Sequence, residues 1–196
     1  EALARLDDCL ADYARHTDGF GPDRVSVVGT NAIRDAPDRD RVARILDARL
    51  GVELTVLSGE EEALCSFAGA RLGVNGSGEI MVIDIGGAST ELVRGGPEGS
   101  QAAVSLQLGA VRQTERHIAS DPPAPHELAA LREEAGALLR GALGEIGGPA
   151  AAVGVAGTVT TLAAIDLGAY DPRRVDGHRL PVAVIRRITD ALAAVP

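Results

Sequence analysis

The sequence predicts an α/β protein, and three observations lead to that fold class. Segments with helical periodicity alternate with short apolar runs bounded by glycine, a pattern typical of strands connected by helices. The chain has 196 residues, of which 45% are hydrophobic, so it can bury a core of ordinary size. Its apolar runs are far shorter than the roughly 20 residues of a membrane span, and no charged-then-apolar leader opens it. We therefore expect a cytoplasmic protein.

The first part of the chain predicts helices alternating with two strands. Leu3, Leu6, Leu10 and Tyr13 recur on one face of a helix, and Gly51 has the position of a left-handed cap. The expected elements are a helix over 1–16, a strand over 24–29, a helix over 37–51, a strand over 52–57 and a helix over 59–72. The glycine-rich stretch 73–78 then predicts a linker.

Beyond the linker, three apolar stretches at hairpin spacing predict an antiparallel meander, after which helices and strands alternate. We therefore expect two domains, over residues 1–74 and 75–196. The expected elements are strands over 79–85, 89–95, 101–108 and 151–155, helices over 109–119, 125–146, 157–168 and 182–194, and an irregular or strand segment over 173–180.

The charge composition excludes several classes of protein. The net charge is −9 without a basic block, which argues against binding to a nucleic-acid backbone. All 19 basic residues are arginine, so the chain has no lysine for a P-loop, a protein-kinase site or a Schiff base. Cys9 and Cys65 lack a histidine at metal spacing, and we expect buried thiols. The four histidines form no set, and we expect them at the surface.

A carboxylate and a turn of small residues end the first strand of the meander. Asp84 precedes Gly86 and Gly87, where a turn without side chains exposes N–H groups to a phosphate and the carboxylate can hold a divalent ion. Glu91 on the returning strand is a candidate second carboxylate, and the alternative is a plain glycine hairpin capped by Asp84. The hydroxyl groups of two further residues add candidate phosphate donors, namely Ser89 and Thr90.

Two other places predict contact with an anion. Gly157 and Thr158 follow a buried strand at the start of a helix, where unpaired N–H groups and the helix dipole favour negative charge. Any strand-to-helix turn favours these residue types, so the pattern alone is not specific. Arg34 follows the first strand and is suited to bidentate phosphate contact, although an ion pair with Asp35 or Glu60 would give the same pattern.

Glu62 is the candidate general base. Ser58 and Glu61 form a capping box, which accounts for Glu61 but not for Glu62. At helical spacing Glu62 heads a stripe of small residues that can face a cleft, where a carboxylate can activate water, and a solvated glutamate is the alternative. The small-residue stripe is Cys65, Ser66, Gly69 and Gly73, opposite a bulky stripe of Leu64, Phe67 and Leu72.

Four blocks of sequence together resemble the exopolyphosphatase and guanosine pentaphosphate phosphatase family of the actin and sugar-kinase superfamily. They are VVGTNAIRDA (27–36), LSGEEEA (57–63), VIDIGGASTEL (82–92) and VGVAGTVTTLAA (153–164), in family order. The resemblance implies a two-lobed ribonuclease-H-like (actin-like ATPase) α/β fold with the site in the cleft between the lobes. It also implies hydrolytic release of the terminal phosphate from inorganic polyphosphate or guanosine pentaphosphate.

The resemblance also implies roles for individual residues. Glu62 resembles the catalytic glutamate that activates the attacking water, and Asp84 and Glu91 resemble the acidic positions associated with Mg²⁺ or Mn²⁺. In-line phosphoryl transfer is consistent with this set, because it needs positioned water, a metal and many donors. The positions that resemble phosphate-binding ones are Gly86, Gly87, Ser89, Thr90, Gly157, Thr158 and Arg34.

Two departures from the family pattern change the expectations. The family's third glycine is Ala88 here, which is tolerable if that residue keeps a negative φ. The family's opening phosphate hairpin is not matched, so the chain resembles an internal fragment with both lobes incomplete. We expect it to be poorly soluble or inactive alone. We also expect no membrane or specific nucleic-acid partner, and a homodimer is a possible state of the complete protein.

Two other functions stay open from the sequence. One is an ATP-dependent kinase or chaperone-type ATPase of the same superfamily, and the other is a noncatalytic sensor of polyphosphate or alarmone that signals through a partner. A role for Glu62 in turnover would distinguish the hydrolase from the kinase or ATPase. Binding of substrate without release of product would favour the sensor.

Overall fold

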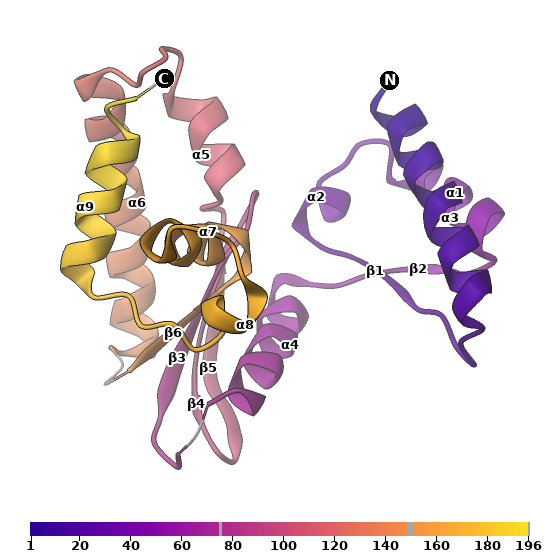
Figure 1. Cartoon of the computed structure of the whole chain (residues 1–196), viewed down its shortest axis with the longest axis horizontal. Coiled ribbons are helices and arrows are strands. Elements are labelled where there is room, and N and C mark those ends of the chain that lie inside the picture. Colours follow the sequence, from indigo (N-terminus) through magenta and orange to yellow (C-terminus); the bar gives the residue numbers. More distant parts are fainter. Residues whose placement is uncertain (75, 149–150, 196) are drawn as a thin grey trace. The chain divides into compact units, whose positions relative to one another are not determined.

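The structure is a computed structural model that describes residues 1–74, 76–148 and 151–195. It contains two compact units, Glu1–Ser58 and Gly59–Pro196, whose elements are labelled in Figure 1. The fold is mixed α/β, as the sequence predicts. Each unit has its own sheet and its own buried cluster.

Unit 1 packs two helices beside a parallel pair of strands, with Val28 of β1 opposite Thr55 of β2. Leu10, Val42 and Leu46 form its buried cluster. Tyr13 is 61% exposed and Cys9 is also exposed, so both are wrongly predicted as inward. The elements are α1 (Ala2–Phe20), β1 (Val27–Gly29), α2 (Asn31–Arg34), α3 (Arg39–Leu50) and β2 (Leu54–Val56).

Unit 2 is built on a four-stranded sheet in the order β5-β4-β3-β6. β3, β4 and β5 form the predicted antiparallel meander, and β6 pairs parallel to β3. The elements of this unit are α4 (Gly59–Leu72), β3 (Ile80–Ile85), β4 (Thr90–Gly96), β5 (Gly99–Leu106), α5 (Ala110–His117), α6 (Pro125–Ile146), β6 (Ala152–Val155), α7 (Ala156–Leu167), α8 (Pro172–Val175) and α9 (Val182–Leu192).

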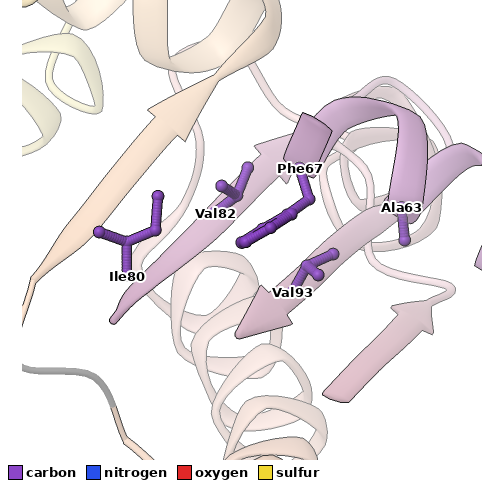
Figure 2. Packing of buried hydrophobic residues seen from close by; sticks show 5 residues of the cluster. All are labelled: Ala63, Phe67, Ile80, Val82 and Val93. Carbon is purple, nitrogen blue, oxygen red and sulfur yellow. The ribbon is translucent and has the colours of Figure 1, made fainter. Parts of the chain in front are cut away.

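Helices cover both faces of this sheet, because strand side chains alternate between faces. On one face, Ala63 and Phe67 of α4 pack against β3 and β4, as Figure 2 shows. On the other face, Ala142 and Ile146 of α6 do the same. The strand residues buried against α4 are Ile80, Val82 and Val93, and those buried against α6 are Met81 and Leu92.

The compact units of the structure divide at Ser58/Gly59, whereas the sequence predicts domains that divide at residues 74/75, and the domain division stays a prediction. Helix α4 belongs to unit 2 because Ala63 and Phe67, at 0% and 4% exposure, are part of that unit's core. The predicted linker over 73–78, of which residue 75 lies outside the described residues, falls between α4 and β3 of one unit. A connection within one unit can have the same glycine-rich composition as a linker between two units. The expected bulky stripe is also wrong at Leu72, which is 91% exposed.

Several smaller predictions differ from the structure. Residues 173–180 contain the short helix α8, begun by Pro172 and by Asp171, whose carboxylate accepts from the Arg173 N–H. Cys65 is exposed rather than buried. In the part of the chain that the structure describes, every helix is too short or too polar to cross a bilayer.

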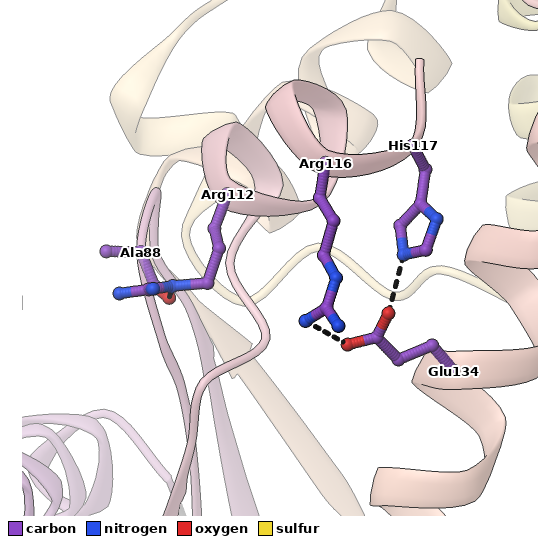
Figure 3. Close-up of polar contacts among 5 residues, drawn as sticks. All are labelled: Ala88, Arg112, Arg116, His117 and Glu134. Carbon is purple, nitrogen blue, oxygen red and sulfur yellow. Dashed lines mark hydrogen bonds and ion pairs between the residues drawn. The ribbon is translucent and has the colours of Figure 1, made fainter.

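Two histidines are held in polar clusters rather than lying free at the surface as expected. The Nε2 atom of His117 lies 2.6 Å from an oxygen of Glu134, which also pairs with Arg116 at 2.7 Å. His178 Nε2 lies 3.0 Å from Asp166. Figure 3 shows that Arg116 and His117 project from α5 toward Glu134 on α6. The first cluster therefore fastens α5 to α6.

Candidate active site

The predicted carboxylates and the two glycine-containing turns meet at one edge of the unit 2 sheet. Strands β3 and β6 are parallel neighbours, with Asp84 in register with Val155. Their carboxyl ends therefore lie side by side, so the turn after Ile85 and the turn after Val155 are adjacent. This edge at the ends of parallel strands is the usual place for a ligand in an open α/β sheet.

Asp84 and Glu91 are directly opposite each other across β3 and β4. Opposed residues of an antiparallel pair project from the same face, and like charges there repel. The hydroxyl of Ser66 on α4 donates to Asp84 Oδ2 at 2.5 Å, and that of Ser105 donates to Glu91 Oε1 at 2.7 Å. Asp84 is half-buried, whereas Glu91 is 1% exposed, so Asp84 is the carboxylate that a ligand can reach.

Glu62 stands one turn of α4 before Ser66, on the same side of the helix. Since Ser66 contacts Asp84, this spacing places Glu62 beside the acidic pair at the sheet edge. Glu62 is half-buried and its Oε2 atom is shielded from solvent, whereas Glu60 and Glu61 in the same helical turn are exposed. The structure thus separates Glu62 from its acidic neighbours. Of the predicted small-residue stripe, Ser66 is half-buried, whereas Cys65 and Gly69 are exposed.

The turn between β3 and β4, residues 86–89, is called the glycine turn below. The Gly86 N–H donates to the Ser89 carbonyl at 3.0 Å and closes the turn. The Thr90 hydroxyl, predicted to bind phosphate, donates instead to the carbonyl of Leu108, and Thr90 is 3% exposed. Among the backbone bonds of the described residues, the N–H groups of Gly87, Ala88 and Ser89 have no acceptor. These three N–H groups are the candidate donors of the turn, of which Gly87 is exposed, Ala88 is half-buried and Ser89 is 3% exposed.

Ala88 replaces the third glycine without strain. Among the described residues, Ala156 is the non-glycine residue with positive φ, so Ala88 keeps the negative φ that its methyl group requires. Gly86 and Gly87 do not use the left-handed region either.

The turn between β6 and α7 has a different structure. Ala156 at the start of α7 has a φ of 66°, a backbone conformation that side chains disfavour. A Cβ atom added to Gly157 would meet nothing within 4 Å, so this glycine faces open space. Thr158 is half-buried in the first helical turn, whose N–H groups face the same sheet edge. Strained residues and open glycines are typical of places where a ligand approaches the backbone.

Arg34 lies in unit 1, where its Nη1 atom donates to the Leu57 carbonyl at 2.5 Å. This bond ties the short helix α2 to the segment that follows β2. Arg34 therefore has a structural contact that its sequence position does not reveal.

Sequence reasoning missed several residues of this site. Ser105 faces Glu91, and Gly109 and Arg112 hold the glycine turn from α5. The sequence signal for this set is the small-residue stripe that includes Ser66. Residues 109–112 belong to a stretch that the sequence predicts as helical, and nothing in that stretch indicates contact with the glycine turn.

The carboxylates at this sheet edge suit Mg²⁺, which needs few protein ligands, better than a metal ion whose ligands all come from the protein. In the described residues, no three acidic, histidine or cysteine side chains are grouped to hold an ion. Mg²⁺ commonly uses one or two carboxylates and completes its shell with water and substrate phosphates. A cation at the accessible side of Asp84 would also offset the repulsion between Asp84 and Glu91. The residues present therefore fit this ion.

The architecture is the actin-like ATPase fold, with two glycine-containing turns at one sheet edge, and comparisons identify the family. Residues 1–192 match the model of the Ppx/GppA phosphatase family, and the chain belongs to that family.

Two named relatives match 98% and 60% of this chain. Exopolyphosphatase 2 of Mycobacterium tuberculosis is 38% identical over 98% of this chain and 63% of its own length. A guanosine-5'-triphosphate,3'-diphosphate pyrophosphatase of Vibrio atlanticus is 37% identical over 60% of this chain and 24% of its own. This chain thus spans less than two thirds of the length of these relatives.

Solved structures agree with the fold. An exopolyphosphatase-like protein is 34% identical with a TM-score of 0.94, covering 99% of this chain and 64% of that one. The Aquifex aeolicus PPX-GPPA enzyme is 29% identical with a TM-score of 0.80 and the same coverage. The unit 2 sheet and its helices are therefore those of the family.

Proposed function

We propose that the complete protein is a phosphoanhydride hydrolase that releases the terminal phosphate of inorganic polyphosphate, guanosine pentaphosphate or both. The observation that carries this proposal is the meeting of Glu62, Asp84, the glycine turn and the α7 N-terminus at one sheet edge. Membership of the Ppx/GppA family supports the substrate class. The two kinds of named relative support one substrate each.

Each part of the edge has a distinct task in phosphate release. Hydrolysis needs a terminal phosphate held by several donors and a water held in line with the breaking bond. The N–H groups of the glycine turn and of the first turn of α7 would hold phosphate oxygens. Glu62 would accept a proton from the attacking water, since a half-buried carboxylate beside the site is suited to act as general base.

Asp84 would hold Mg²⁺ or Mn²⁺, with the Ser66 hydroxyl orienting its second oxygen. When bound, such an ion neutralises charge on phosphate oxygens. Glu91 is buried and accepts a hydrogen bond from Ser105, so it would support Asp84 and would not bind the ion directly. Arg34 remains a candidate phosphate contact from unit 1.

Replacing the candidate base tests the proposal. We expect Glu62→Gln in the complete protein to lower phosphate release from polyphosphate by about 10²–10⁴-fold, the usual worth of a general base. Binding of inorganic phosphate should change little, because the amide keeps the shape of the side chain. A phosphate-release assay with both substrates measures the first effect and calorimetry the second.

Glu60→Gln is the matched control, because it makes the same charge change in the same turn of α4 at an exposed position. Equal activity of Glu62→Gln and Glu60→Gln would refute the assignment of the base. If the unmodified protein binds both substrates and releases no phosphate from either, it is a sensor and not a hydrolase. If the unmodified protein does release phosphate, parallel kinetics on the two substrates decide which one it prefers.

A further inference from the structure

We infer that the first turn of α5 positions the glycine turn for anion binding and that Arg112 is its positioning residue. This inference rests on the proposed function, because it concerns how the same site holds phosphate. It assigns a role to a segment that takes no part in the chemistry.

Four donors of α5 hold three consecutive carbonyl groups of the glycine turn. The Ala110 N–H donates to Gly86 O at 2.9 Å. The Val111 and Arg112 N–H groups donate to Gly87 O at 2.8 and 3.0 Å. Arg112 also donates from Nε to Ala88 O at 2.8 Å, and Figure 3 shows its guanidinium beside Ala88. Every carbonyl from Gly86 to Ala88 is thus directed at α5.

Because each peptide unit is planar, the hydrogen bonds to these carbonyl groups also fix the direction of the N–H groups in the glycine turn. In a trans peptide the N–H points opposite to the C=O of the same unit, and the peptides of the glycine turn are trans. Since the three carbonyls point at α5, the N–H groups of Gly87, Ala88 and Ser89 point away from it. Successive N–H groups directed to one side form a concave anion site.

The electrostatics of α5 reinforce this orientation. The first N–H groups of a helix have no partner within the helix and carry its positive end. Here they are used by the turn, so α5 itself does not bind the anion. Its field instead polarises the three peptide units, which strengthens their outward N–H groups as donors.

Packing leaves the turn little freedom to leave this position. A Cβ atom on Gly109 would lie 2.3 Å from the carbonyl carbon and oxygen of Gly87, so the backbones touch there. The Thr90 hydroxyl fastens the far side of the turn to Leu108. The contacts of His117 and Arg116 with Glu134 fix α5 on α6. A cradle held this way is formed before the ligand arrives, which lowers the entropy cost of binding.

The test uses Arg112→Met in the complete protein, with inorganic phosphate as the probe and backbone amide NMR as the readout. In the unmodified protein, phosphate should shift the amide signals of Gly87, Ala88 and Ser89. In Arg112→Met we expect the affinity for phosphate to fall by about tenfold, one charge-assisted hydrogen bond to the turn being lost. The shifts of the Ala88 and Ser89 signals should shrink most.

Arg132→Met is the matched control, because it removes the same group from α6, where Arg132 pairs with Asp190 of α9 instead of with the turn. It should leave the phosphate affinity unchanged. Arg112→Lys covers the case in which Arg112→Met does not fold, and it should fail to restore affinity since lysine keeps the charge without the Nε donor.

The inference is overturned if Arg112→Lys restores full affinity, if Arg112→Met binds like the unmodified protein, or if phosphate leaves the three amide signals unmoved. It survives a failure of the proposed function, because phosphate can shift these amides in a protein that hydrolyses neither substrate. Turnover by the unmodified protein without these shifts would reject the inference alone.

Discussion

The glycine turn and the β6–α7 turn lie side by side and present backbone N–H groups in opposite ways. In the first, unstrained residues are held from behind by α5, with Gly109 against the backbone of Gly87. In the second, Ala156 is strained at a φ of 66° and Gly157 has open space around it. The same composition of glycine and hydroxyl residues thus gives a supported cradle in one place and an exposed helix end in the other.

This difference separates two reasons for a glycine at a candidate phosphate site. Gly109 is required by the fold, because a methyl group there would strike the neighbouring backbone. Gly157 is not required by the fold, so its value lies in what approaches it from outside. Substituting each glycine by alanine therefore probes packing at one turn and ligand approach at the other.

The largest effect is expected for Gly109→Ala. A Cβ atom 2.3 Å from Gly87 forces the glycine turn to move, and overpacking of this kind costs about 1–3 kcal/mol. Both the free energy of unfolding, measured in urea, and the affinity for inorganic phosphate should fall. Gly144→Ala in α6, where a Cβ meets nothing within 4 Å, is the control and should keep both. If Gly109→Ala changed neither the free energy of unfolding nor the phosphate affinity, the close packing of Gly109 would not be what supports the glycine turn.

Gly157→Ala should separate binding from stability. Its Cβ meets no atom and its φ is not positive, so the free energy of unfolding should stay the same or rise slightly. If phosphate approaches this backbone, the methyl group should weaken binding by about tenfold, comparable to losing one charge-assisted hydrogen bond. Calorimetry with inorganic phosphate measures this. Unaltered affinity would remove the β6–α7 turn from the site.

The smallest effect concerns the loop that supports α5 from the other end. The Ser120 hydroxyl and the N–H groups of Ala119 and Ala124 donate to Glu127 and lower its pKa to about 2 from 4.5. Because the folded pKa is the lower one, this stabilisation is present above about pH 4.5 and is lost as the pH falls through about 2.

Glu127→Gln should therefore be less stable than the unmodified protein at neutral pH, with the difference shrinking between pH 4.5 and 2. Urea unfolding across that range measures it, and Glu133→Gln, at an exposed position of the same helix, is the control. A difference that does not depend on pH would show that the Glu127 carboxylate is not what the loop requires.

Most elements of the fold were predictable because local chemistry specifies them. Helix α6 begins at Pro125 and ends at Ile146, as its leucine spacing and its proline indicate. Gly51 has the predicted left-handed conformation at the end of α3. The short helix α8 was missed because four residues carry no periodicity. Its signals were a capping aspartate and a proline, which also occur in turns.

The candidate site was predictable only in part. Asp84, Glu91, Gly87 and Ser89 lie at the sheet edge that the hairpin spacing implied. The use of Thr90 was not predictable, because a hydroxyl after a glycine turn can face a ligand or a neighbouring carbonyl with equal ease. Arg112 lies 24 residues from its partner Ala88 in sequence, so no local pattern could connect them.

The sequence by itself determined the α/β class, the family resemblance, the acidic pair and the positions of both turns. The class, the acidic residues and the turns follow from periodicity and spacing, which act over a few residues, whereas the family resemblance rests on the four blocks of sequence. Only the tertiary structure decided that α4 belongs to unit 2, that Glu62 stands beside Asp84 through Ser66, and that α5 turns three peptide groups of the glycine turn outward. Each of these depends on which distant segments pack together. Packing is set by the burial of whole faces and not by any one stretch of residues.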